Sequence, residues 1–220
     1  MLKGGLVVPR ARRRGHVEGG LPALTLGRST CGNLDVSHRR EWLVTNGIGG
    51  YASGTVSGLN TRRYHGVLVA ALHPPVGRTL LVSKLDATVA YRGVRYPLSC
   101  NEFRDGTIDP HGYTHLDTFA LEGLIPVWRY ALSDALVDVR VWMAHERNTT
   151  YTTFSLSRGS APIELTMWPL CTYRDLHGHT QGGWEPGRRP ILGGFELTAF
   201  DGARPYRVVA DRADFEDRPD

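Results

Sequence analysis

The chain has 220 residues, of which 41% are apolar and 22% are charged, a composition typical of globular proteins. It contains no run of about 18 apolar residues, so no transmembrane helix is expected, and no signal peptide follows the basic N-terminus. We therefore expect a cytoplasmic protein without a membrane partner. Its three cysteines, Cys31, Cys100 and Cys171, are far apart in sequence and are expected to stay reduced.

The net charge of +4 comes from the N-terminus. Residues 1–40 contain eight lysines and arginines and two acidic residues, whereas the rest of the chain carries 18 basic and 20 acidic residues. A nucleic-acid-binding protein is expected to spread positive charge over its folded surface, so nucleic acid is not an expected partner. We predict that residues 1–36 form a disordered basic leader and that residues 37–220 form a single domain.

From about residue 40 onwards the dominant hydrophobic period is two. In residues 136–144, LVDVRVWMA, valines alternate with other side chains. Residues 149–157, 163–170, 195–200 and 206–210 are further β-branched or aromatic runs separated by Gly, Pro or Asp. Sustained helical spacing is not found. This pattern predicts an all-β protein, an antiparallel β-sandwich of the supersandwich type.

Residues 46–66 have the sequence NGIGGYASGTVSGLNTRRYHG. Five glycines come first, and a cluster of polar side chains that begins with two arginines follows them. The start of this stretch matches a loose dinucleotide-binding pattern, but the residues that follow are typical of turns and strands, and position 70 is Ala where an acid is needed. No nucleotide or other cofactor is expected. We predict instead that Gly49, Gly50, Gly54 and Gly58 let strands bend or pack closely.

Four polar residues follow the glycines: Arg62, Arg63, Tyr64 and His65. If this segment enters a strand, alternation places Arg62 and Tyr64 on one face and Arg63 and His65 on the other. One of these faces must lie against the core. An arginine placed there needs a partner or a solvated cleft, because an unpaired buried charge is costly.

Three kinds of partner remain open for these arginines. The hydroxyls of a polyhydroxylated ligand could accept their hydrogen bonds, and so could a carboxylate of a neighbouring domain. The third possibility is an acid within this domain, such as Glu41 or Asp175, in which case the pair only braces the fold.

A second polar cluster, RDLHGH, occupies residues 174–179. On a strand, His177 and His179 could face a metal together, but a His-x-His pair without further ligands is weak support for one, and we predict no metal site. The cluster is expected either to form a structural polar network or to line a glycan-binding or interdomain cleft.

Other residues could in principle recognise or cleave a sugar. We expect Trp142 and Trp168 to be buried, whereas Trp184, in a Gly- and Pro-rich segment, is the best candidate for an exposed ring that stacks on a sugar. The polar loop 100–117 is long enough to be functional. Glycoside cleavage requires two carboxyl groups about 5–9.5 Å apart, which sequence spacing cannot establish, so an autonomous hydrolase remains an alternative.

Residues 41–89, which begin EWLVTNGIGGYASGTVSGLNTRRYHGVLVAAL, resemble the N-terminal domain of bacterial and archaeal glycogen debranching enzymes of the amylo-α-1,6-glucosidase type. Residues 168–182, WPLCTYRDLHGHTQG, resemble the RDxH stretch later in the same domain, and the resemblance extends from Arg40 to the C-terminus. It implies a β-sandwich followed, in the full enzyme, by a catalytic α/α-toroid that carries the acid and base for hydrolysis of the α-1,6 branch glucose.

On this resemblance the chain is the substrate-facing scaffold domain of a debranching enzyme, and this part of the enzyme has no catalytic residue of its own. Its expected partners are α-glucan, such as glycogen, and the toroid of the same full-length chain. A free-standing carbohydrate-binding module without catalysis is the alternative. The expected substrate-binding residues are Asn60, Arg62, Arg63, Tyr64, His65, Arg174, Asp175, His177 and Trp184.

Overall fold

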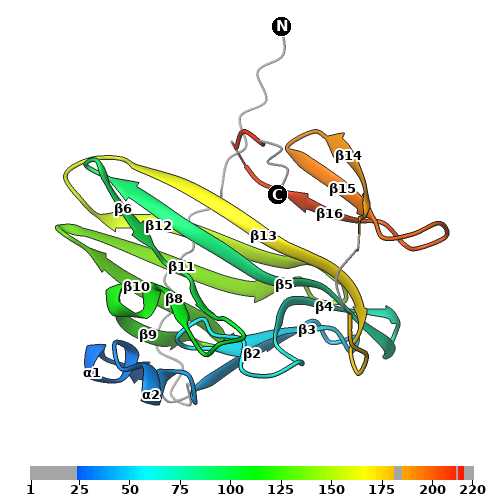
Figure 1. The fold of residues 1–220 in the computed structure, drawn as a ribbon, viewed down its shortest axis with the longest axis horizontal. Coiled ribbons are helices and arrows are strands. Elements are labelled where there is room, and N and C mark those ends of the chain that lie inside the picture. Colours follow the sequence, from blue (N-terminus) through cyan, green and yellow to red (C-terminus); the bar gives the residue numbers. More distant parts are fainter. Residues whose placement is uncertain (1–23, 181–184, 212, 216–220) are drawn as a thin grey trace, which may run out of the picture.

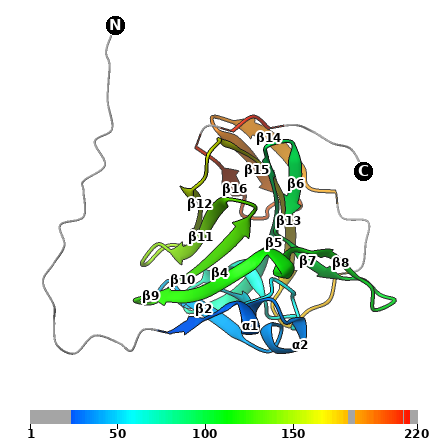
Figure 2. The same ribbon diagram turned by 90° about the vertical axis from the view of Figure 1, so that its left-hand side faces the viewer.

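The structure, a computed structural model, describes residues 24–180, 185–211 and 213–215 (Figure 1). It consists largely of antiparallel strands, which confirms the predicted all-β class. Two large sheets lie face to face across one hydrophobic core and form the sandwich (Figure 2). Two smaller sheets are attached to it.

The first large sheet has five strands. Their order across the sheet is β1 (Thr25–Leu26), β9 (Leu116–Glu122), β10 (Ile125–Leu132), β11 (Ala135–Met143) and β12 (Thr150–Arg158). The second large sheet has six strands. Their order is β13 (Ile163–Asp175), β5 (Val76–Tyr91), β4 (Gly66–His73), β3 (Tyr51–Thr55) and β2 (Glu41–Thr45), with β6 (Val94–Pro97) paired to the end of β5.

The smaller elements lie around this sandwich. They are the hairpin β7 (Cys100–Glu102) and β8 (Ile108–His111), the three-stranded sheet β14 (Gly187–Ile191), β15 (Gly194–Thr198) and β16 (Tyr206–Val209), the helices α1 (Arg28–Cys31) and α2 (Leu34–Ser37), and the 3-10 turn η1 (Gly112–His115). The three-stranded sheet contacts β13, because the Tyr206 hydroxyl donates a hydrogen bond to the Thr172 carbonyl at 2.9 Å. The helices among the described residues have four residues each, too short for any of them to cross a membrane.

The core is built by the period of two that the sequence shows. The three valines of the alternating run in β11 are buried, and Val89 and Tyr91 of β5 reach the same core from the opposite sheet. Trp128 of β10 packs edge to face with Trp42 and Phe119, with ring centroids 5.2 Å apart in each pair. The sheets are therefore held together by apolar contacts, the strongest favourable contribution to folding.

The folded part starts earlier than the predicted boundary at residue 37. Thr25 and Leu26 pair with Ala120 and Phe119 of β9, and Cys31 in α1 is completely buried. β1 thus forms one edge of the five-stranded sheet, and Leu26 and Cys31 contribute to the core. Most of the arginines that suggested a leader belong to residues 1–23, which lie outside the described part of the chain.

The two tryptophans expected in the core lie in less buried positions. Trp142 is half-buried and stacks on Tyr151, with centroids 5.4 Å apart. Trp168 is 37% exposed on β13, so its predicted burial is wrong. Its side chain points to the outer face of the six-stranded sheet, whereas its neighbour Met167 packs against the core.

Candidate functional surface

The glycine stretch begins with a turn that the side chain of Asn46 organises. The Asn46 Oδ1 atom accepts hydrogen bonds from the backbone amides of Ile48 (3.1 Å) and Gly50 (2.9 Å). Gly47 and Gly49 have φ angles of +81° and +98°, in the left-handed region that favours glycine. A Cβ at Gly49 would also lie 2.4 Å from the carbonyl oxygen of Pro75. Gly49 therefore has the structural role that was predicted for it, and Gly47, which was not part of that prediction, has a similar conformation.

The amide of Asn46 also joins the two sheets. Its Nδ2 donates to the Arg147 carbonyl and to Asn148 Oδ1, both at 3.0 Å. Asn148 in turn exchanges two hydrogen bonds with the backbone of Ala71 in β4. The turn before β3 is thus fixed against the β11–β12 connection, and the chain that follows starts from a rigid point.

The later glycines differ from one another. Gly58 has a φ of +85° in the turn after β3, where the Thr55 hydroxyl also donates to the Leu59 carbonyl at 2.7 Å. Gly54 lies within β3 with no positive φ, and a Cβ there would be 3.2 Å from the Trp42 ring. Gly54 is therefore part of the strand, which ends at Thr55, whereas Gly58 belongs to the turn that follows it.

The polar residues 62–65 form a turn and not a strand, so the expected alternation of their faces is wrong. The His65 amide donates to the Arg62 carbonyl at 3.1 Å, and β4 begins one residue later. Arg62 Nε lies 2.6 Å from Glu41 Oε1, and His65 Nε2 lies 3.3 Å from the same oxygen. Arg62 and His65 thus brace the start of β2, one of the open interpretations.

His65 is the buried member of this turn. Only 4% of the residue is exposed, and its Nδ1 has no hydrogen-bond partner among the described residues. Burial lowers the pKa of the imidazole, although the nearby Glu41 carboxylate acts in the opposite direction. A neutral His65 that donates from Nε2 to Glu41 fits this environment.

Arg63 and Tyr64 point the other way and meet the second polar cluster. Arg174 Nη2 donates to the Arg63 carbonyl at 2.5 Å, and Arg63 Nη1 donates to the His177 carbonyl at 3.1 Å. The Tyr64 hydroxyl lies 3.4 Å from His177 Nδ1, and the two rings meet edge to face. Segments more than 100 residues apart in sequence therefore form one surface.

The 174–178 segment is shaped by its own polar groups. Arg174 Nη1 donates to the carbonyls of Leu176 (3.2 Å) and Gly178 (2.9 Å). Asp175 Oδ1 accepts a hydrogen bond from the His177 amide at 2.9 Å. Arg174 is thus occupied by backbone carbonyls, and it positions the turn whose exposed imidazole meets Tyr64.

We call the exposed side chains of Arg63, Tyr64 and His177 the RYH surface. They present a guanidinium, a phenol and an imidazole to solvent, three groups that donate or accept hydrogen bonds. Arg62 and His65 contact Glu41 instead, and we call these three residues the Glu41 cluster. Asn60 lies apart, since its amide donates to the Ser83 carbonyl at 3.0 Å, and Trp184 lies outside the described residues.

The RYH surface has the chemistry of recognition. Its residues can bind hydroxyls or carboxylates in several directions. The carboxylate of Glu41, at the start of β2, is not part of this surface, because it is already paired with Arg62 and His65. In the described part of the chain, no three His, Cys, Asp or Glu side chains are arranged to hold a metal ion.

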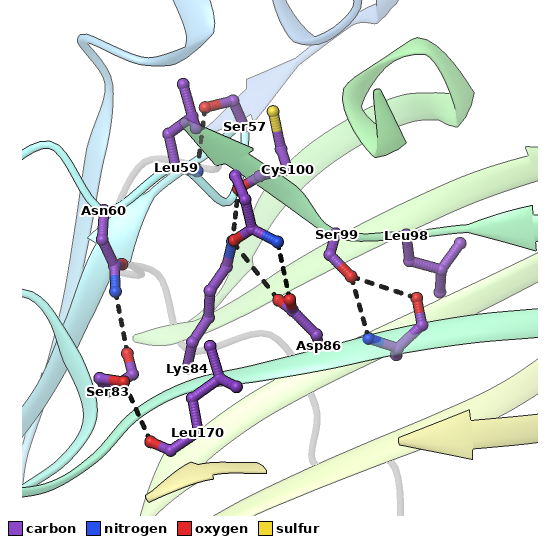
Figure 3. Close-up of polar contacts among 12 residues, drawn as sticks. Ser57, Leu59, Asn60, Ser83, Lys84, Asp86, Leu98, Ser99, Cys100 and Leu170 are labelled. Carbon is purple, nitrogen blue, oxygen red and sulfur yellow. Dashed lines mark hydrogen bonds and ion pairs between the residues drawn. The ribbon is translucent and has the colours of Figure 1, made fainter. Parts of the chain in front are cut away.

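A second polar group of residues was not predicted. Lys84 and Asp86, which are labelled in Figure 3, lie on the outer face of β5, and the side chain of Asn101 from β7 bridges them. The sequence does carry a signal for it: the run TLLVSKLDATV places a lysine and an aspartate two residues apart, and hence on one face of an otherwise apolar strand.

A comparison with protein families agrees with this fold. The family model described as glycogen debranching enzyme N terminal matches residues 40–220. The chain belongs to this family. It has no significant match among curated proteins or among solved structures. The matched range includes the RYH surface, the Glu41 cluster and the group around Lys84, so each is part of a glycogen debranching enzyme N-terminal domain.

Proposed function

We propose that this chain is the glucan-facing scaffold of a glycogen debranching enzyme, an enzyme that hydrolyses the α-1,6 branch glucose of glycogen. In this proposal the RYH surface borders the cleft between the sandwich and a catalytic α/α-toroid of the same full-length polypeptide. The toroid supplies the general acid and base, and the enzyme acts in the cytoplasm. Family membership supports the link to debranching.

The observation that carries the proposal is the meeting of the two polar segments. Arg174 fixes the Arg63 carbonyl, and Arg63 and Tyr64 both contact His177. A brace alone would not require the side chains of Arg63, Tyr64 and His177 to remain exposed after these contacts are made. Hydrogen-bond donors that face solvent and are already held in place suit a ligand rich in hydroxyls. Less side-chain conformational entropy is lost on binding, because the fold has already ordered these side chains.

Affinity electrophoresis of the purified 220-residue chain tests the proposal. We expect glycogen in the gel to retard the chain, and we expect Arg63→Ala and Tyr64→Ala to reduce the retardation. Arg95→Ala is the matched control, because Arg95 is exposed on β6 at the opposite end of β5. Migration that glycogen does not affect would contradict a glucan-facing role.

A parallel assay addresses the division of labour with the toroid. The chain alone should release no glucose from a limit dextrin. Release that disappears in Asp175→Asn would show that this domain contains its own catalytic carboxylate, and would overturn the scaffold assignment.

A further inference from the structure

A groove separate from the RYH surface opens on the outer face of the six-stranded sheet. Its volume is about 310 Å³. The residues that line it are Asn60, Ser83, Lys84, Asn101, Glu102, Phe103, Arg104 and Leu170. They come from the turn before β4, from β5 and β13, and from the β7–β8 hairpin with its loop. We call this the hairpin groove.

The floor of the hairpin groove is a polar network (Figure 3). The buried Lys84 Nζ donates to the Cys100 carbonyl and to Asn101 Oδ1, and it lies 3.4 Å from Asp86 Oδ1. Asn101 Nδ2 donates to Asp86 Oδ2 at 2.8 Å. Burial lowers the pKa of Lys84, and Asp86 opposes this effect. The network uses its donors internally and ties the hairpin to β5.

The wall of the groove, by contrast, carries side chains that are not used by the fold. The side chains of Glu102 and Arg104 are exposed and have no hydrogen-bond or ionic partner among the described residues. Phe103 between them is 56% exposed. Its backbone is held in place, because the Phe103 amide donates to the Thr107 carbonyl at 2.8 Å.

Apolar surface continues from the groove along β13. Leu170 is opposite Lys84 and Trp168 is opposite Asp86 in the strand register, so both share the outer face with the network. Leu170 is 43% exposed and Trp168 is 37% exposed. The exposed indole of Trp168, two residues from Leu170, extends the apolar surface beyond the groove, so the surface is longer than a single sugar unit needs.

These features restrict the chemistry of a ligand. The charges of Glu102 and Arg104 cancel, as do those of Lys84 and Asp86, so neither an anion nor a cation is favoured. A carboxylate, a guanidinium and the amide of Asn60 can each bind vicinal hydroxyls, while aromatic rings cover the apolar faces of sugar rings. A neutral polyhydroxylated chain with apolar faces is the class of ligand that can both hydrogen-bond to the polar side chains and stack on the aromatic ring.

We propose that the hairpin groove is a second glucan-binding site, which holds a stretch of α-1,4-linked glucose units apart from the RYH surface. The choice of glucan over other neutral oligosaccharides rests on the proposed function. Phe103 stacks on a sugar ring, Glu102 and Arg104 bind its hydroxyls, and Lys84 acts as a positioning residue that holds the hairpin. Through this site the domain binds an outer chain of a branched glucan.

Isothermal titration of the 220-residue chain with maltoheptaose tests the site. We expect Phe103→Ala to weaken binding about five- to tenfold, the scale of one aromatic contact. Glu102→Gln should weaken it as well, because the amide no longer offers two equivalent acceptors. Both side chains are exposed, so the melting temperatures should stay at the wild-type value, and Arg95→Ala should leave binding unchanged.

The outcomes separate this inference from the proposed function. Wild-type maltoheptaose affinity in both groove variants, together with glycogen retardation that still depends on Arg63, would overturn the groove and leave the proposed function in place. Equal affinity for cellohexaose would contradict the assignment to α-1,4-linked glucan. Loss of maltoheptaose binding in Phe103→Ala with retention in Arg63→Ala would establish two distinct sites.

Discussion

The guanidinium of Arg174 donates a hydrogen bond to the backbone carbonyl of Arg63, 111 residues earlier in the chain. Its other nitrogen binds carbonyls of the turn that follows β13. One side chain therefore fixes two turns relative to each other, and the RYH surface depends on it.

Replacing Arg174 by lysine should separate these turns. A lysine keeps the charge but cannot direct donors to both turns with a planar guanidinium. We expect the free energy of unfolding to fall by about 1–3 kcal/mol, the range for hydrogen bonds to charged groups. Glycogen retardation should weaken in the same variant. Urea unfolding measures the first effect, and Arg95→Lys, which should change neither property, is the control.

The two adjacent arginines should behave differently. Arg62→Ala removes an ion pair with Glu41 in which 64% of the Arg62 side chain is exposed, so it should cost less than about 1 kcal/mol and leave glycogen binding intact. Arg63→Ala should leave the melting temperature nearly unchanged and weaken glycogen binding. The reverse pattern, with binding lost only in Arg62→Ala, would contradict the proposal, because it would place the ligand at Glu41 and not at the RYH surface.

Alanine substitutions should rank the glycines by geometry. Gly58→Ala meets no close atom and should cost about 1 kcal/mol for its positive φ alone. Gly49→Ala adds a clash with the Pro75 carbonyl oxygen and should cost about 2–4 kcal/mol. Gly54→Ala, without a positive φ, should cost the least of the three. Melting temperatures decide the order, and equal values would show that close approach to Pro75 is unimportant.

Acidification should destabilise the domain partly through His65. Its pKa is lowered in the folded state below the ordinary value of 6.5, so the unfolded chain binds the proton more strongly. Stability is therefore fully present above pH 6.5 and falls as the pH drops towards the folded-state pKa. The charged groups that face His65 are Glu41 and Arg62.

His65→Gln should make this pH dependence shallower, because an amide does not titrate. Melting temperatures between pH 7.5 and 5.5 measure the slope. Some slope should remain, since burial and Arg28 also lower the pKa of His115. His179→Gln, at an exposed position, should keep the wild-type slope. An unchanged slope in His65→Gln would mean that another group controls the acid response.

The sequence was sufficient for the fold class because alternation is a local property. The valines of β11 are buried as their period of two predicts. Exposure of Trp168 could not be derived in this way, because alternation divides β13 into two faces without showing which of them packs against the opposite sheet. The pairing of β1 with β9 was missed for a similar reason, since a two-residue strand has no detectable period.

For the candidate site, the motifs identified segments but not orientations. Arg63 and His177 were both among the expected substrate-binding residues, and the structure brings them into contact. The separation of Arg62 and His65 from that surface was not predictable, because a turn replaces the strand on which the alternation argument relied. Binding of a ligand by these residues stays a prediction.

The pairing of β5 with β13 has a consequence for how the chain reaches its folded state. β5 has 16 residues, and β13 covers one side of it from Thr79 to Tyr91. During synthesis from the N-terminus, β6 to β12 are made before β13 exists, so a long strand edge stays open to other nascent chains. Lys84 and Asp86 place charges within the apolar run of that edge, an interruption of the kind that lowers the tendency of an open strand to aggregate.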